Sequence, residues 1–192
     1  GVMAQKPVNL TCAQAAAVPY GGMLALHYLK KGQVTNGQKV LIYGASGAIG
    51  TFAVQLARHF GAQVTGVCST ANLELVKSLG AERVIDYTRQ DFTAGGERYD
   101  LILNAVGKSK AQLHCKHALS PTGKHITVDD GGPEFSTQAL VSLKELIEAG
   151  TLHPVIDRTY PLEQIVEAHR YVDLGHKKGN VVISVGQEAS IA

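Results

Sequence analysis

The stretch Lys39-Val-Leu-Ile-Tyr-Gly-Ala-Ser-Gly-Ala-Ile-Gly-Thr-Phe-Ala-Val-Gln-Leu-Ala-Arg58 decides the fold. It begins with an apolar run of the kind that forms a parallel strand buried on both faces. Gly44, Gly47 and Gly50 come next, and an apolar pattern with helical spacing follows at once. Glycines at such a strand-to-helix turn let backbone N–H groups approach a pyrophosphate at the positive end of the helix.

This turn is therefore predicted to bind a dinucleotide, because a glycine triplet between a strand and a helix has the structural context that the motif requires. The alternatives are a purely structural turn or a different nucleotide ligand. The predicted cofactor-binding residues of the turn are Gly44, Ala45, Ser46, Gly47, Ala48, Ile49 and Gly50.

Strand and helix patterns alternate on both sides of the turn. Strands are expected at 39–43, 62–67, 82–85, 99–105 and 124–128, and helices near 48–60, 71–79 and 109–119. Such alternation is typical of right-handed βαβ units. The predicted fold class is α/β, a doubly wound parallel (Rossmann) sheet of five or six strands with helices on both faces.

Further elements are expected at the two ends of the chain. Thr11-Cys-Ala-Gln14 fits a capping box at the start of a short helix, and a second helix is expected from Pro19 to just before Gly32. The later part of the chain shows a helix pattern near 136–149, a strand at 155–160, a helix from Pro161 and a last strand at 181–185; residues 187–192 have the composition of a frayed end.

The composition of the chain limits which classes of partner and which cellular compartment we expect. A chain of 192 residues with 45% hydrophobic residues suits one globular domain, or one domain and part of another. Its net charge of +2 gives no reason to expect nucleic acid or a membrane surface as a partner, and no apolar stretch could cross a bilayer. Residues 1–6 resemble neither a signal nor a transit peptide, and three widely spaced cysteines indicate no disulfide framework, so we expect a cytoplasmic protein.

No metal site is predicted. The eight histidines are scattered, and the one suggestive group, His114-Cys-Lys-His117, places two imidazoles three residues apart without a third ligand. Cys115 is expected to act as a small buried apolar residue.

The chain resembles the zinc-independent, quinone-oxidoreductase-like (zeta-crystallin-like) branch of the medium-chain dehydrogenase/reductase superfamily. Stretches that carry the resemblance follow the order of the family over nearly the whole chain. They are Ala15-Ala-Ala-Val-Pro-Tyr-Gly-Gly22, Val40-Leu-Ile-Tyr-Gly-Ala-Ser-Gly-Ala-Ile-Gly50, Ser69-Thr-Ala-Asn-Leu-Glu-Leu-Val-Lys-Ser-Leu-Gly-Ala81, Val84-Ile-Asp-Tyr87, Tyr99-Asp-Leu-Ile-Leu-Asn-Ala-Val-Gly107 and Val155-Ile-Asp-Arg-Thr-Tyr-Pro-Leu162.

The resemblance implies a division into lead-in helices at 1–35, a Rossmann domain at 36–132, and C-terminal elements at 133–192. In the family, these last elements are a remnant of a GroES-like catalytic domain and pack on it. We expect this chain to be the cofactor-binding half, because it starts where that domain would be ending. It also runs through 131–136 without the connection and strand usual in the family, which implies either that this strand is deleted or that the sequence omits a disordered stretch. Strand edges left open would favour a homo-oligomer.

The preference between NADH and NADPH is predicted from the end of the second predicted strand, where NAD-preferring folds have an Asp or Glu that holds the ribose 2′-OH. Here Cys68 stands near that position, and no carboxylate occurs before Glu74. Hydroxyls of Ser69 and Thr70 could contact a 2′-phosphate, or could only cap the next helix. The resemblance adds Tyr87 as a phosphate neighbour but not the usual basic residue, since Ala71 stands there. NADPH is expected, with NADH as the alternative.

The ends of the fourth and fifth predicted strands complete the candidate site. Asn104, Val106 and Gly107 would lie beside the nicotinamide ribose, because ligands lie at the carboxyl ends of parallel strands. By resemblance, Val128 would hold the carboxamide through its backbone. Strand-end packing is the alternative for each of these residues.

The resemblance implies an NADPH-dependent oxidoreductase that transfers hydride to a quinone, enone or similar activated carbonyl of a small-molecule substrate. The alternatives are a nucleotide-binding or self-associating module without turnover, and an enoyl-reductase segment of a larger synthase. A short-chain dehydrogenase is disfavoured because no tyrosine has a lysine four residues later. No catalytic residue is assigned: Leu24 replaces the family's threonine, and Tyr20, Asp129 and Asp130 have no identifiable partners.

Overall fold

The computed structural model describes residues 1–107, 115–133 and 135–186. Its centre is a parallel sheet of five strands in the order β3-β2-β1-β4-β5. The strands are β1 (Lys39–Tyr43), β2 (Gln63–Cys68), β3 (Arg83–Asp86), β4 (Tyr99–Asn104) and β5 (Leu119–Thr127). This order reverses between β1 and β4, as in a Rossmann sheet, and the predicted fold class is confirmed.

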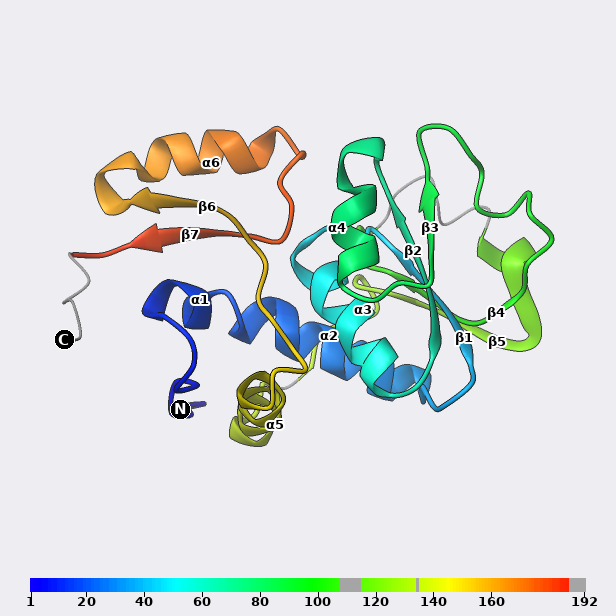
Figure 1. Cartoon of the computed structure of the whole chain (residues 1–192), viewed down its shortest axis with the longest axis horizontal. Coiled ribbons are helices and arrows are strands. Elements are labelled where there is room, and N and C mark those ends of the chain that lie inside the picture. Colours follow the sequence, from blue (N-terminus) through cyan, green and yellow to red (C-terminus); the bar gives the residue numbers. More distant parts are fainter. Residues whose placement is uncertain (108–114, 134, 187–192) are drawn as a thin grey trace.

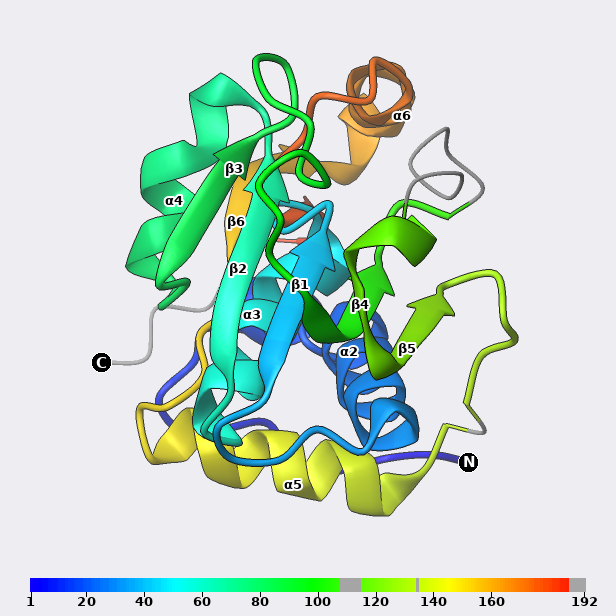
Figure 2. The ribbon, with the colours of Figure 1, turned by 90° about the vertical axis from the view of Figure 1, so that its right-hand side faces the viewer.

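Helices cover one face of the sheet. They are α2 (Pro19–Gly32), α3 (Ala48–His59) and α4 (Leu73–Ser78), the last preceded by the 3-10 turn η1 (Thr70–Asn72). In Figure 2, α2 and α3 lie behind the sheet. The larger apolar cluster of the core lies on this side of the sheet. Its fully buried members include Leu29 of α2, Phe52 of α3 and Leu101 of β4.

The other face is covered differently from the prediction. A helix was predicted at 109–119; residues 109–114 lie outside the described part, but 115–118 form the 3-10 turn η3 (Cys115–Ala118) and Leu119 already belongs to β5. The prediction is wrong there because Leu119 pairs with Tyr99 across a bulge, which starts β5 well before residue 124. Phe92 and Cys115 fill the smaller apolar cluster beneath.

The first helices are close to the prediction. In α1 (Cys12–Ala16), the N–H of Gln14 donates to Oγ1 of Thr11 at 3.2 Å, and the N–H of Thr11 donates back to the Gln14 side chain at 2.9 Å, so the capping box is confirmed. Helix α2 runs one residue further than predicted and includes Gly32, where a Cβ would lie 2.7 Å from Leu101. Gln33 then takes the left-handed C-cap conformation.

Helix α5 (Thr137–Glu148) packs with the sheet domain rather than with the elements that follow it. Leu143 and Ile147 are fully buried in the same cluster as α2, and Leu143 reaches the backbone of Gly22. One continuous core therefore crosses both of the boundaries predicted at 35 and 133.

A separate βαβ unit, called the tail unit below, ends the described chain. It contains β6 (Ile156–Pro161), the turn η4 (Leu162–Gln164), α6 (Ile165–Asp173) and β7 (Asn180–Ser184). Strands β6 and β7 pair in parallel, and the unit projects to the left of the sheet domain in Figure 1. The buried Gln55 of α3 ties it down, since its side chain accepts from N–H of His153 at 2.8 Å and donates to the carbonyl of His153 at 3.0 Å.

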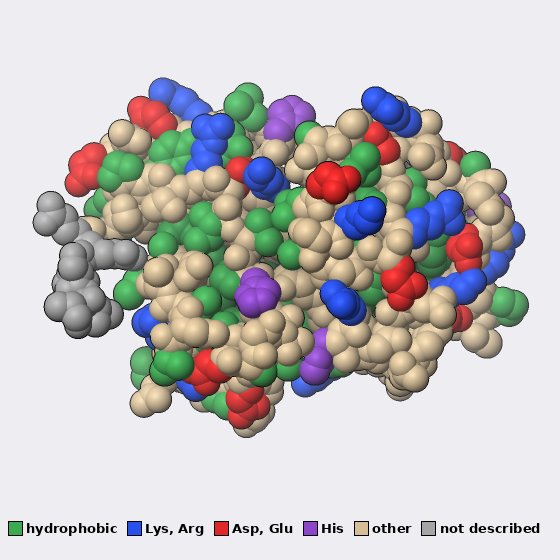
Figure 3. Space-filling model, viewed as in Figure 1, with side chains coloured by type: hydrophobic (Ala, Val, Ile, Leu, Met, Phe, Trp, Pro, Cys, Tyr) green, Lys and Arg blue, Asp and Glu red, His purple; other side chains and the backbone are tan. Residues whose placement is uncertain are grey.

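Among the described residues, no helix is long and apolar enough to span a bilayer. In the described part of the chain, Cys12, Cys68 and Cys115 form no disulfide bond. On the face seen in Figure 3, acidic and basic side chains are interspersed, and apolar atoms gather over the tail unit and its junction with the sheet domain.

Candidate functional site

The glycine turn, residues 44–50, leaves β1 at the point where the strand order reverses. Gly44 has φ of +80°, and a Cβ on it would lie 2.4 Å from Val106. The N–H groups of Gly44 and Ala45 both donate to the carbonyl of Val67 at 3.0 Å, which folds the turn over the end of β2. Ala45 is fully buried, so its role here is to pack the turn.

Gly47 and Gly50 have different roles. A Cβ on Gly50 would lie 2.1 Å from the carbonyl oxygen of Gly44, so only glycine lets α3 start this close to the strand. Gly47 is the N-cap of α3, has no capping side chain, and would tolerate a Cβ 3.5 Å from Gly44. The first N–H groups of α3 have no partner within the helix and therefore form a site for an anion.

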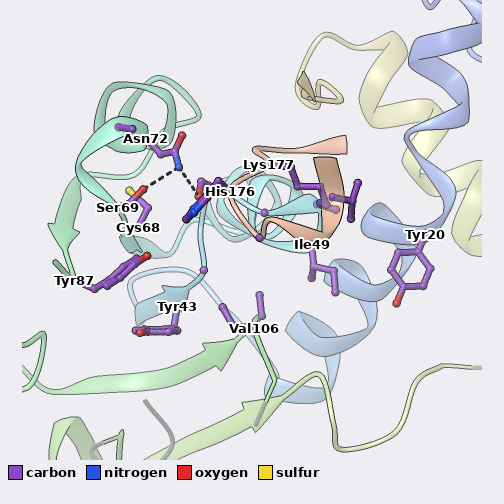
Figure 4. Close-up of a pocket in the computed structure, with 18 residues that line it drawn as sticks. Tyr20, Tyr43, Ile49, Cys68, Ser69, Asn72, Tyr87, Val106, His176 and Lys177 are labelled. Carbon is purple, nitrogen blue, oxygen red and sulfur yellow. Dashed lines mark hydrogen bonds between the residues drawn. The ribbon is translucent and has the colours of Figure 1, made fainter. Parts of the chain in front are cut away.

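A cavity of about 670 Å³ lies along this turn. Of the predicted residues, Gly44, Ser46, Gly47, Ala48, Ile49, Ser69, Tyr87 and Val106 line it. Figure 4 shows it as an elongated space with Tyr87 at one end, Tyr20 at the other and the glycine turn between them. An extended ligand with an anionic centre fits this shape.

Donors from two strand-to-helix turns meet at the Tyr87 end. The side-chain N–H₂ of Asn72 donates to the hydroxyls of Ser46 and Ser69, each at 3.2 Å (Figure 4). Cys68 also lines this end, and burial, with Asp86 nearby, raises the pKa of its thiol to about 11. No carboxylate is among the residues that line the cavity.

Thr70 does not line the cavity. Its hydroxyl donates to Oδ2 of Asp86 at 2.5 Å, and Thr88 donates to the other oxygen of that carboxylate through its N–H and its hydroxyl. These bonds, from Thr70 first and then Thr88, lower the pKa of Asp86. The hydroxyl predicted to bind a 2′-phosphate is therefore already engaged with the end of β3.

The end of β4 is shaped by a buried asparagine. Asn104 donates to the carbonyl of Gly107 at 2.8 Å and accepts from the N–H of Val106 at 3.1 Å. Asn104 and Gly107 hold the turn, and neither lines the cavity. This turn presents Ala105 and Val106 to the cavity, and Val106 is 57% exposed.

A second cavity of about 510 Å³ continues past the Tyr20 end. It shares Tyr20, Ile49 and Ala105 with the first, and Val128 lines it. Both backbone groups of Val128 already have partners: its N–H donates to the carbonyl of Asn104 at 3.1 Å, and its carbonyl accepts from the hydroxyl of Tyr28 at 3.0 Å. Only a second lone pair of that carbonyl remains for the predicted contact with a carboxamide.

The tail unit supplies a wall of the first cavity that the sequence did not predict. Gly175, His176 and Lys177, on the loop between α6 and β7, line it together with Val172. The N–H of Gly179 donates to the carbonyl of Ser46 at 2.7 Å, so this loop is bonded directly to the glycine turn. Nζ of Lys177 donates to the carbonyl of Gly179 at 2.9 Å, and burial lowers its pKa.

Tyr43 and Asn72 are further lining residues that were missed. For the tail loop a signal does exist in the sequence, because Gly175-His-Lys-Lys-Gly179 concentrates positive charge between two glycines just before a strand. Nothing local shows which part of the protein that charge faces.

Within residues 1–107, 115–133 and 135–186, no group of three or more His, Cys, Asp and Glu side chains is arranged to hold a metal ion. His117 is exposed and Cys115 is buried, with its thiol pKa raised by burial to about 11. His114 lies outside the described residues.

Residues 48–161 match the family described as zinc-binding dehydrogenase. The chain is 35% identical to 2-methylene-furan-3-one reductase of Solanum lycopersicum, with 95% of this chain and 49% of the relative covered. It is 32% identical to the chloroplastic NADPH-dependent alkenal/one oxidoreductase of Arabidopsis thaliana, with 95% and 50% covered. A solved structure, the quinone oxidoreductase from Coxiella burnetii, matches with a TM-score of 0.88 at 28% identity, over 95% of this chain and 64% of that chain.

The chain thus spans about half the length of these curated relatives. The matched segment includes α3, β2, β3, β4 and β5, and so contains most of the sheet and about half of the residues that line the first cavity. On this evidence the chain belongs to the zinc-binding dehydrogenase family, in the quinone-oxidoreductase-like branch of the medium-chain dehydrogenase/reductase superfamily.

Proposed function

We propose that the first cavity binds NADPH and that the protein is the cofactor-binding part of an oxidoreductase that transfers hydride to a quinone, enone or similar activated carbonyl. One observation carries this proposal. The open N-terminus of α3 lies at the middle of an elongated cavity, where a dinucleotide has its pyrophosphate.

The preference for NADPH over NADH rests on the Tyr87 end of the cavity. An NAD site holds the ribose with a carboxylate, and none lines this cavity. The hydroxyls of Ser46 and Ser69 accept from Asn72 and keep their own O–H groups as donors that suit a phosphate. The relatives include NAD(P)H oxidoreductases and an NADPH-dependent alkenal/one oxidoreductase, which supports a nicotinamide cofactor.

In the reaction, the bound dihydronicotinamide supplies the hydride, while this chain binds and orients. Amides at the start of α3 hold the pyrophosphate, and Val106, Ile49 and Ala105 form an apolar wall at the Tyr20 end that excludes water. The second cavity, next to that wall, is the place for the hydride acceptor.

We also propose that the described residues bind no zinc in the reaction, because no group of three or more His, Cys, Asp and Glu side chains among them is arranged to hold a metal ion. Association is also proposed, because the tail unit exposes the apolar side chains of Leu162, Val166 and Leu174. Sedimentation at rising concentration tests it: a growing dimer fraction is expected, and a monomer throughout contradicts it.

Calorimetric titration of the chain with NADPH and with NADH tests the cofactor proposal. NADPH is expected to bind more tightly, and Ser69→Asp is expected to weaken NADPH by about tenfold or more while sparing NADH, through repulsion of the 2′-phosphate. Ser78→Asp, on the exposed end of α4, is the matched control. Tighter binding of NADH, or equal losses for both cofactors, would contradict the preference.

Steady-state oxidation of NADPH with a quinone or an enone tests hydride transfer separately. Binding without any turnover would favour a nucleotide-binding module, and turnover confined to acyl-thioester enoyl substrates would favour an enoyl reductase of a synthase.

A further inference from the structure

The tail unit contains a polar cluster centred on Asp157 of β6. The hydroxyl of Tyr171, on α6, donates to Oδ2 of Asp157 at 2.5 Å, and the N–H of Lys178 donates to the same oxygen at 3.2 Å. The guanidinium of Arg158 lies 4.0 Å from the centre of the Tyr171 ring, which holds that ring over the strand. One carboxylate oxygen thus links β6, α6 and the loop before β7.

The N–H of Lys178 belongs to the peptide group that joins Lys177 to Lys178. Asp157 therefore fixes the backbone directly after Lys177. On the other side, the N–H of Gly179 donates to the carbonyl of Ser46 in the glycine turn at 2.7 Å. Lys177 is held between an anchor in the tail unit and the glycine turn itself, and it lines the cavity beside Gly47 and Ala48.

Charge supports this geometry. Burial lowers the pKa of Lys177, and the negative charge of Asp157 opposes that shift, so the carboxylate favours the ammonium form. The hydrogen bond to Asp157 also raises the pKa of Tyr171, which keeps the phenol protonated as the donor.

We propose that Asp157 is a positioning residue for the cofactor: it fixes the Lys177–Lys178 peptide group and thereby holds the Lys177 ammonium where it can reach the pyrophosphate. One of the three N–H donors of this ammonium goes to the carbonyl of Gly179, and the other two are left for the cofactor. The inference rests on the proposed function, because it needs a dinucleotide in the first cavity. Asp157 itself does not line that cavity. Its effect on binding therefore passes through Lys177.

A double-mutant cycle on cofactor binding tests this. Titration with NADPH at low salt is expected to show about tenfold weaker binding for Asp157→Asn and for Lys177→Met, the loss of one charge-assisted contact. The double variant is expected to bind no more weakly than Lys177→Met alone. The dependence of affinity on salt should flatten equally in all three, because each loses the same ionic contact. Asp173→Asn, with the same charge change at the exposed end of α6, should bind like the wild type.

Hydrogen exchange without cofactor gives an independent readout. Asp157→Asn should speed exchange at the amides of Lys178 and Gly179 without changing exchange in α3, and Tyr171→Phe should do so less, since Lys178 still donates to the carboxylate. Should Asp157→Asn fail to fold, Tyr171→Phe carries the test, with about threefold weaker binding expected.

Normal NADPH affinity in both Asp157→Asn and Tyr171→Phe would overturn the positioning role and leave the proposed function intact. Additive losses in the double variant would also overturn it, since Asp157 would then act independently of Lys177. A wild-type chain that does not bind NADPH would overturn the proposed function, and the positioning role with it.

Discussion

The glycine turn at 44–50 and the tail loop at 174–179 line the same cavity, but they differ in how their function is encoded. In the turn, every feature is local: a strand, three glycines and a helix start follow one another within twelve residues, 39–50. The tail loop reaches the same place only because α5, β6 and α6 return the chain to the sheet. A binding site can thus combine a part that a motif reveals with a part that only the fold reveals.

The two regions also differ in what holds them. The turn is fixed by backbone hydrogen bonds to the neighbouring strand, from the N–H groups of Gly44 and Ala45 to the carbonyl of Val67 in β2. The loop depends on contacts made elsewhere, at Gln55 with His153 and at Asp157 with Lys178. Substitutions in the turn should therefore change stability or cofactor binding directly. The position of the loop should also change when residues far from the cavity are substituted.

The largest effect is expected for Gly50→Ala. Its Cβ would lie 2.1 Å from a backbone oxygen, so we expect about 3 kcal/mol lower unfolding free energy, from strain comparable to overpacking, and loss of NADPH binding. Gly47→Ala is the matched control: its Cβ fits, so stability should fall by less than about 1 kcal/mol while binding is still weakened at the helix start. Urea unfolding and calorimetry measure both. Equal stability of the two variants would contradict the assigned glycine roles.

A smaller effect is expected when the tail unit is released from α3. Gln55→Leu leaves the N–H and carbonyl of His153 without their partner, which should lower the unfolding free energy by about 2 kcal/mol. NADPH affinity should fall by about threefold, because the Gly179–Ser46 bond still holds the loop. Gln90→Leu, at an exposed position, is the control. Unchanged affinity in Gln55→Leu would show that the loop is placed without this anchor.

The smallest effect is expected for Thr70→Val, and it depends on pH. Asp86 has a lowered pKa in the folded protein, so it adds stability above its unfolded pKa of about 3.8, and that stability is lost as pH falls through the folded value. Without the Thr70 hydroxyl, the pKa should rise toward its usual value. Thermal unfolding at pH 7 and pH 3 should show a deficit in the variant that is larger at pH 7.

NADPH affinity of Thr70→Val should match the wild type, whereas Ser69→Ala should bind more weakly at nearly normal stability. The opposite pattern would return Thr70 to the role first predicted for it, as a ligand of the 2′-phosphate.

The sequence was sufficient for the first four strands of the sheet and for one wall of the site, because these strands and the glycine turn can be recognised from runs of consecutive residues. It was not sufficient for Thr70, whose hydroxyl is taken by Asp86 from another strand, or for β5, whose early start depends on pairing with Tyr99. The same holds for Lys177. Its charge is visible in the sequence, but its position depends on contacts between residues far apart in the chain.

Hydrogen exchange with and without saturating NADPH tests most directly whether the two regions form one site. Binding is expected to slow exchange both at 46–50 in the glycine turn and at 176–179 in the tail loop. Protection confined to 46–50, with the loop unchanged, would contradict this account.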